Sequence, residues 1–199
     1  MKMTRAFAVA LFLALLAGCA HPPRAAIDAA RGAVDAAARN ADIVTYAPDA
    51  LRAAQDKMAA LQAEIEQQAH RSALSRNYDA CSSLAQDTVT LATRASSEAQ
   101  DAKKEVATEA AGLVDEVTAA IPGFESKMWA ARRVPRVKME VIAPLAAVPD
   151  QARDAVDEAR KDIAAGAFAA ARARLMAAKD QLSSSEETIT EQVRIARAR

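Results

Sequence analysis

Few side chains in this sequence have the types and spacing that catalysis or metal binding requires. Glu66 and His70 are four residues apart, which places both on one face of a helix, where they could supply two metal ligands. His21 is the only other histidine, and no second Glu and His motif completes a di-metal site. No glycine-rich phosphate loop and no serine nucleophile elbow is present. We therefore predict no catalytic residue, no cofactor and no metal site.

The two cysteines stand in different surroundings. Cys81 follows a helical pattern of apolar residues, so we expect a buried small side chain, with a mixed disulfide to another protein as the alternative. Cys19 instead ends a segment in which Lys2 and Arg5 precede an uninterrupted apolar run over residues 6–17. This order is typical of a secretory signal. A helix of this length spans about 18 Å, which is less than the roughly 30 Å of a bilayer core and disfavours a retained transmembrane helix.

The last residues of this signal resemble the lipobox of bacterial lipoproteins, in the order Leu16, Ala17, Gly18 and Cys19. The resemblance implies that the signal peptidase recognises Leu16, Ala17 and Gly18, that residues 1–18 are removed, and that the Cys19 thiol is acylated, commonly with palmitate. The alternative is an ordinary secretory signal with Cys19 near its cleavage point. Two or three acyl chains anchor a protein almost permanently. In this class an Asp after the cysteine favours the inner membrane, whereas Ala20 implies the periplasmic face of the outer membrane.

The composition predicts an all-α protein. The chain has 199 residues, of which 54 are Ala, only 7 are aromatic and only 5 are Gly. Alanine is the best helix former, and so few aromatics limit the depth of any core. Lys plus Arg and Asp plus Glu both number 26, which argues against a nucleic-acid partner. We expect elongated antiparallel helical hairpins or a thin bundle with coiled-coil-like, alanine-rich seams.

Prolines and polar clusters divide the chain after the signal. We predict a lipidated tether at 19–24, a helical hairpin domain at 25–121, an irregular basic connector containing prolines at 122–149, and a second helical hairpin at 150–199. Within them, apolar residues recur at steps of three and four, as in Leu51, Ala54, Met58, Leu61 and Ile65, and again in Cys81, Ala85, Thr88, Ala92, Ala95, Ala99, Ala102 and Val106.

The expected helix boundaries follow from local signals. One helix should run from Arg24 to about Thr45 and end before Pro48. A long helix should begin after Asn77 and be broken at Pro122 and Gly123. Gly166 should separate the last two helices, and capping-box spacings within 183–187 predict a stop and restart in the final helix.

The two halves also show a similar order of residues. Pro48 and Tyr78 in the first half correspond to Pro149 and Phe168 in the second, at spacings of 30 and 19 residues. The difference of 11 is about three helical turns, so a duplicated hairpin would keep its buried face. Chance similarity in an alanine-rich chain is the alternative.

One cluster has residue types suited to an anionic surface: Trp129, Arg132, Arg133, Arg136 and Lys138. Four cations and an amphipathic ring within ten residues can contact lipid phosphates or the anionic glycan of an envelope. A solvated basic connector is the alternative.

Residues 25–102 resemble a family of alanine-rich bacterial envelope lipoproteins with a domain of unknown function, often found ahead of an OmpA-like domain. The resemblance is carried by residues 46–51, Ala54, Leu61, residues 77–80 and the alanines at 85, 92, 95 and 99. No OmpA-like domain follows here, because the rest of the chain lacks alternating strands. The family implies an envelope location and helical structure, and it transfers no catalytic residue.

Three function classes follow from these observations. The leading one is a non-enzymatic, membrane-anchored scaffold, spacer or adaptor in the periplasm, with a protein partner in the envelope. The second is an envelope protein that contacts anionic lipid or peptidoglycan through residues 129–138. An envelope hydrolase is the third.

Overall fold

The computed structural model describes residues 21–198, in which every regular element is a helix. This confirms the all-α fold class. The described residues form two compact units, one ending at Gln100 (unit 1) and the other starting at Asp101 (unit 2), and the boundary lies within one long helix. Each unit has its own hydrophobic core.

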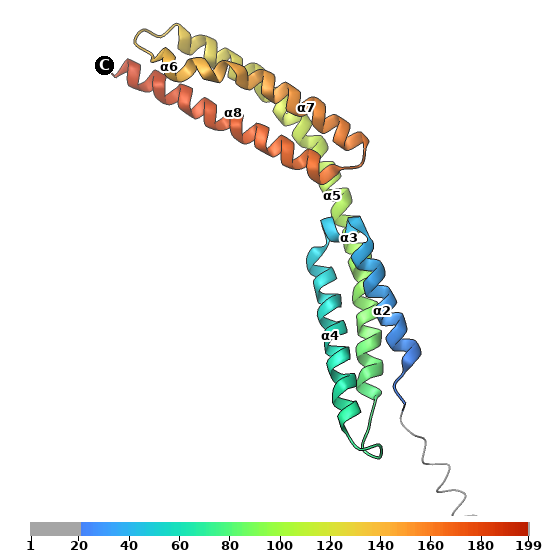
Figure 1. The fold of residues 1–199 in the computed structure, drawn as a ribbon. Coiled ribbons are helices and arrows are strands. Elements are labelled where there is room, and N and C mark those ends of the chain that lie inside the picture. The colour runs from blue at the N-terminus through green and yellow to red at the C-terminus, as the bar shows by residue number, and fades with distance from the viewer. Residues whose placement is uncertain (1–20, 199) are drawn as a thin grey trace, which may run out of the picture. The chain divides into compact units, whose positions relative to one another are not determined.

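Unit 1 contains α2 (Arg24–Arg39), α3 (Ala41–Tyr46), α4 (Pro48–His70) and the first part of α5 (Asp79–Arg132), which pack side by side (Figure 1). Its core confirms the two predicted seams: Leu51, Ala54, Met58, Leu61, Cys81, Ala85, Thr88, Ala92, Ala95 and Ala99 are all buried. Ile65 is half-buried at the edge of this core, and Ala102 and Val106, which were also predicted to lie on the second seam, are only half-buried. Alanines dominate the seam, so the helices approach closely without large side chains between them.

The first helix is shorter than the sequence indicated. The expected helix to Thr45 is interrupted at Asn40, which ends α2 and caps α3, because its Oδ1 accepts a hydrogen bond from the Asp42 amide at 2.9 Å. This capping competes with continuing the helix. The predicted end before Pro48 is confirmed, and this proline occupies the first turn of α4, where its missing amide is tolerated.

The turn between α4 and α5 is held by several polar contacts. The buried Gln68 side chain accepts a hydrogen bond from the Asn77 amide at 3.0 Å, and Asn77 Oδ1 accepts one from the Asp79 amide at 2.8 Å. Arg76 donates to the carbonyl oxygens of Ala69 and Arg71, at 3.2 and 3.1 Å, and so satisfies the C-terminal end of α4. The turn is therefore a defined structure.

Unit 2 contains the remainder of α5, α6 (Met139–Ile142), the 3-10 helix η1 (Ala143–Ala147), α7 (Val148–Ala164) and α8 (Phe168–Arg197). Figure 1 shows α7 and α8 antiparallel and beside α5. Phe124, Ile142 and Leu175 are fully buried and give this core more large side chains than the seam of unit 1. Gly166 ends α7 as predicted: its φ of 76° is left-handed, and the Ala167 amide donates to Asp162 O at 2.8 Å.

The predicted break at Pro122 and Gly123 is wrong, because α5 continues through both residues to Arg132. A proline inside a helix costs about 3 kcal/mol, but Ile121 and Phe124 on either side of it are buried in the core. Burying two such side chains contributes a similar or larger amount. Tertiary packing therefore outweighs the local signal.

The irregular connector predicted at 122–149 is correspondingly shorter. Residues 122–132 belong to α5, and residues 139–149 form α6, η1 and the start of α7, so only residues 133–138 are a non-helical turn. The stop and restart predicted within 183–187 is also wrong, since α8 is continuous. Ser184 and Thr188 direct their hydroxyls to carbonyl oxygens of the preceding turn, while Leu182, Ser185 and Ile189 lie on the buried face.

The close packing of the alanine seam leads to a stability prediction. Ala95 is fully buried and Ala60 is exposed, and both lie within helices of unit 1. Ala95→Leu should destabilise the protein by about 1–3 kcal/mol through overpacking, and Ala60→Leu should change stability by less than about 0.5 kcal/mol. Urea unfolding followed by circular dichroism measures both, and equal midpoints for the two variants would contradict a tightly packed seam.

Candidate functional site

The four lipobox residues, Leu16, Ala17, Gly18 and Cys19, lie outside the described residues. The described chain starts with His21, Pro22 and Pro23, which lead directly into α2 at Arg24. The chain from Cys19 thus reaches unit 1 at the N-terminal end of α2.

The cluster around Trp129 lies at the C-terminal end of α5 and in the turn that follows. Trp129 is 57 % exposed, and the Arg133 guanidinium carbon lies 3.1 Å from the centre of its ring, a cation–π contact. Arg136 occupies the turn with a left-handed φ of 70°, and Lys138 is the N-cap of α6. The structure therefore brings Trp129 and Arg133 into direct contact and places the other cations on the same short segment.

Trp129 and Arg132 together line an open groove of about 330 Å³. Its other lining residues are Glu125, Met128, Ala146, Pro149 and Asp150. The two carboxylates in this groove are both paired with Arg153, at 2.5 Å for Glu125 and 2.7 Å for Asp150. Arg153 balances only one of these two negative charges, so one net negative charge remains in the groove that Arg132 also lines.

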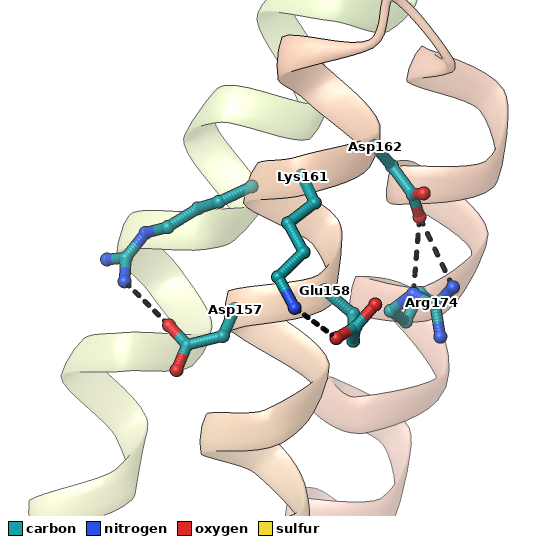
Figure 2. A network of polar contacts seen from close by, with 6 residues as sticks. Asp157, Glu158, Lys161, Asp162 and Arg174 are labelled. Atoms are coloured by element: carbon teal, nitrogen blue, oxygen red, sulfur yellow. Dashed lines mark hydrogen bonds and ion pairs between the residues drawn. The ribbon is translucent and has the colours of Figure 1, made fainter.

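The cations of this cluster differ from those on the faces of α7 and α8. Within residues 21–198, Arg132, Arg133 and Lys138 form no ion pair. On α7 and α8, by contrast, Lys161 pairs with Glu158 at 2.7 Å and Arg174 pairs with Asp162 at 3.3 Å (Figure 2). The hydrogen bond and charge of Lys161 lower the pKa of Glu158. The surface of unit 2 thus has a region of paired charges on α7 and α8, and a segment in which Arg132, Arg133 and Lys138 lack an ion pair among the described residues.

The ion pairs along α7 join residues three apart. A helical spacing of four would pair Asp157 with Arg153 or with Lys161, whereas Asp157 pairs with Arg160 at 3.1 Å, at a spacing of three. Arg153 is already engaged by Glu125 from α5. Tertiary contacts and the three-residue spacing decide these pairs.

An apolar groove near the same end of unit 2 was not predicted from the sequence. Its volume is about 230 Å³, and it is lined by Ala130, Ala131, Val134, Ile189 and Val193, with Lys127, Thr190 and Arg197 at its edges. Met139, in α6, is also 45 % exposed. The groove forms only where α5 and α8 meet, so no local pattern indicates it.

Cys81 is fully buried, as predicted, at the start of α5. Burial, followed by the negative charge of Glu64, raises the pKa of its thiol. Glu66 and His70 are both exposed, and the described residues hold no group of three or more side chains that could bind a metal ion. None of the described helices is sufficiently long and apolar to span a bilayer.

No family model matches this sequence, and no curated protein or solved structure is significantly similar to it. The functional argument therefore rests on the residues themselves.

The burial of Cys81 predicts both its reactivity and a pH dependence. Because its folded pKa is raised, the folded state keeps the proton when the unfolded thiol has lost it. The contribution of the buried thiol to the free energy of unfolding is therefore fully present below the ordinary thiol pKa of about 8.5, and it is lost as the pH rises above that value. In a Cys19→Ala protein, where Cys81 is the sole thiol, we expect modification by a thiol reagent only upon unfolding.

Denaturant titrations at several pH values, compared with a Cys19→Ala, Cys81→Ala protein, isolate the contribution of this thiol. Modification of the native protein as fast as of the unfolded protein would show that Cys81 is accessible.

Proposed function

We propose that this chain is a non-enzymatic, lipid-anchored envelope protein that presents helical surface in the periplasm as a scaffold, spacer or adaptor. The observation that carries the proposal is the order Leu16, Ala17, Gly18 and Cys19 directly after an apolar signal segment. Acylation of Cys19 supplies the anchor, and Ala20 favours the outer membrane, with the inner membrane as the alternative. Similarity to alanine-rich envelope lipoproteins belongs to the same proposal.

The architecture after the anchor supports a role in presenting surface. Each unit buries its own core, and the outer faces of its helices carry charges of both signs. In unit 2, pairs such as Lys179 with Glu116 at 2.6 Å link neighbouring helices across the surface. Long, solvated helical faces of this kind are suited to contact with another protein of the envelope.

The anchor is tested by changing Cys19 alone. Cys19→Ala removes the acylated thiol, so palmitate incorporation should disappear and the protein should leave the membrane fraction or remain uncleaved. Cys81→Ala is the matched control, because it removes the other cysteine and should preserve both labelling and fractionation. Unchanged palmitate labelling of Cys19→Ala would refute the lipid anchor.

A second candidate function is contact with an anionic surface through Trp129, Arg132, Arg133, Arg136 and Lys138. It is favoured by the half-exposed ring stacked on Arg133 and by the absence of ion pairs at Arg132, Arg133 and Lys138 within residues 21–198. An amphipathic ring and these three cations without an ion pair fit the interface of an anionic membrane or the glycan of peptidoglycan.

This contact is tested by replacing Arg132, Arg133, Arg136 and Lys138 with Gln. Each cation near an anionic membrane contributes on the order of 1 kcal/mol, so binding to anionic vesicles or sacculi at low salt should fall at least about tenfold. The helical spectrum should not change, because these side chains are exposed.

The matched control removes four cations that are already paired, Arg160, Lys161, Arg174 and Lys179. The same change in net charge should then have a much smaller effect on binding. Equal losses in the two variants would indicate a non-specific charge effect and reject a contact site at Trp129.

A further inference from the structure

Two chain segments that are far apart in sequence meet at one end of unit 1. Ala33, Ala36 and Ala37 of α2 line a shallow groove together with Ala92, Thr93 and Ser96 of α5. The two helices run in the same direction (Figure 1) and rise equally per residue, so the start of α2 lies level with the start of α5. The turn at 71–77 immediately precedes α5. The N-terminal end of α2 and this turn therefore share one end of the bundle.

The turn at 71–77 presents one large apolar side chain fully to solvent. Leu74 is 100 % exposed, the highest value among the exposed large apolar residues of the described chain. The turn is closed beneath it, since Ser75 donates from both its amide and its hydroxyl to Ser72 O, at 2.9 and 3.0 Å. With Gln68, Arg76 and Asn77 holding both ends, the exposure of Leu74 is fixed by the turn.

The turn and the tether carry positive charge. Arg71 and Arg76 flank Leu74, no acidic residue occurs between His70 and Tyr78, and none occurs between His21 and Ile27, where Arg24 lies. The next acids along the chain are Asp28, in α2, and Asp79, at the start of α5. The partners of the Arg76 guanidinium are neutral carbonyl oxygens, so no carboxylate offsets its positive charge in these contacts. An exposed leucine between arginines offers an apolar group and cations side by side, and apolar burial together with attraction to anionic lipids is what holds a segment at a lipid interface.

The length of the tether keeps this end close to the proposed anchor. Cys19 is five residues before Arg24, so a fully extended chain between them spans at most about 18 Å. Pro22 and Pro23 limit how far the tether can fold back. If acyl chains on Cys19 are in the bilayer, then the start of α2, and the turn beside it, must stay near the bilayer surface.

We propose that the turn at 71–77 docks on the phospholipid bilayer that holds the anchor, with Leu74 inserted at the interface and Arg71 and Arg76 near lipid phosphates. The inference rests on the proposed lipid anchor and adds a second point of membrane contact. Two contacts at one end of unit 1 orient this unit on the membrane, which an acyl tether alone cannot do.

The test compares two labelled positions in the acylated, full-length protein, in vesicles of phosphatidylethanolamine and phosphatidylglycerol. An environment-sensitive fluorophore is attached to Leu74→Cys or, as the matched control, to Val44→Cys, both in a Cys81→Ala background. Val44 is 50 % exposed in α3, at the other end of unit 1. At position 74 we expect a blue-shifted emission and at least about threefold stronger quenching by spin-labelled lipid than at position 44.

The outcomes separate this inference from the anchor. An acylated, vesicle-bound protein whose label at 74 remains in water overturns the inference and leaves the anchor standing. A blue shift without quenching by spin-labelled lipid means that protein covers Leu74, and this also overturns it. A chain that carries no acyl group and does not bind vesicles overturns both proposals. Circular dichroism of both labelled variants verifies that they are folded.

Discussion

The close approach of helices through alanine is the constraint on which this structure depends. Ala30, Ala54 and Ala95 are fully buried in unit 1, where larger side chains would hold the helices apart. An alanine methyl buries little area, so stabilisation has to accumulate along many turns of helix. This explains why the seams extend over whole helices and why only a few large side chains, such as Leu61 and Phe124, are needed to fill the space between them.

Because alanines and a few large side chains fill the cores, large apolar side chains that are exposed need a separate explanation. Leu74 and Trp129 are not required by either core, and both lie where helices end rather than along a seam. Each is accompanied by cations whose charge is not cancelled by a carboxylate, Arg76 for the former and Arg133 for the latter. By contrast, the faces of α7 and α8 are covered by paired charges. The proposed contacts with lipid or another anionic surface are therefore expected at the ends of helices.

Periodic features could be predicted from the sequence because they repeat along a helix. The seam from Leu51 to Leu61 and the burial of Cys81 follow from spacing alone. The break at Pro122 was predicted wrongly, because a local rule took no account of Ile121 and Phe124 packing against α7 and α8. Asn40 was missed for the opposite reason: its capping is local, but it interrupts an apolar stripe that continues through it. The Trp129 cluster was found by composition, whereas its groove required the fold.

The turn that contains Leu74 is longer than the corresponding turn of the second hairpin, formed by α7 and α8. The segment from Pro48 to Tyr78 is 11 residues longer than the segment from Pro149 to Phe168. Seven of these residues lengthen the helix, α4 compared with α7, and four lengthen the turn that follows it. Seven residues are two helical turns and leave the buried face unchanged. The four additional turn residues are not needed to close a hairpin, since the three residues 165–167 close the second one. The residue three positions after the aromatic is fully buried in both hairpins, Cys81 in the first and Ala171 in the second. The longer turn thus contains residues that packing does not require, and Leu74 is among them. Its full exposure, in a turn that hydrogen bonds close, is the observation on which the proposed membrane contact rests.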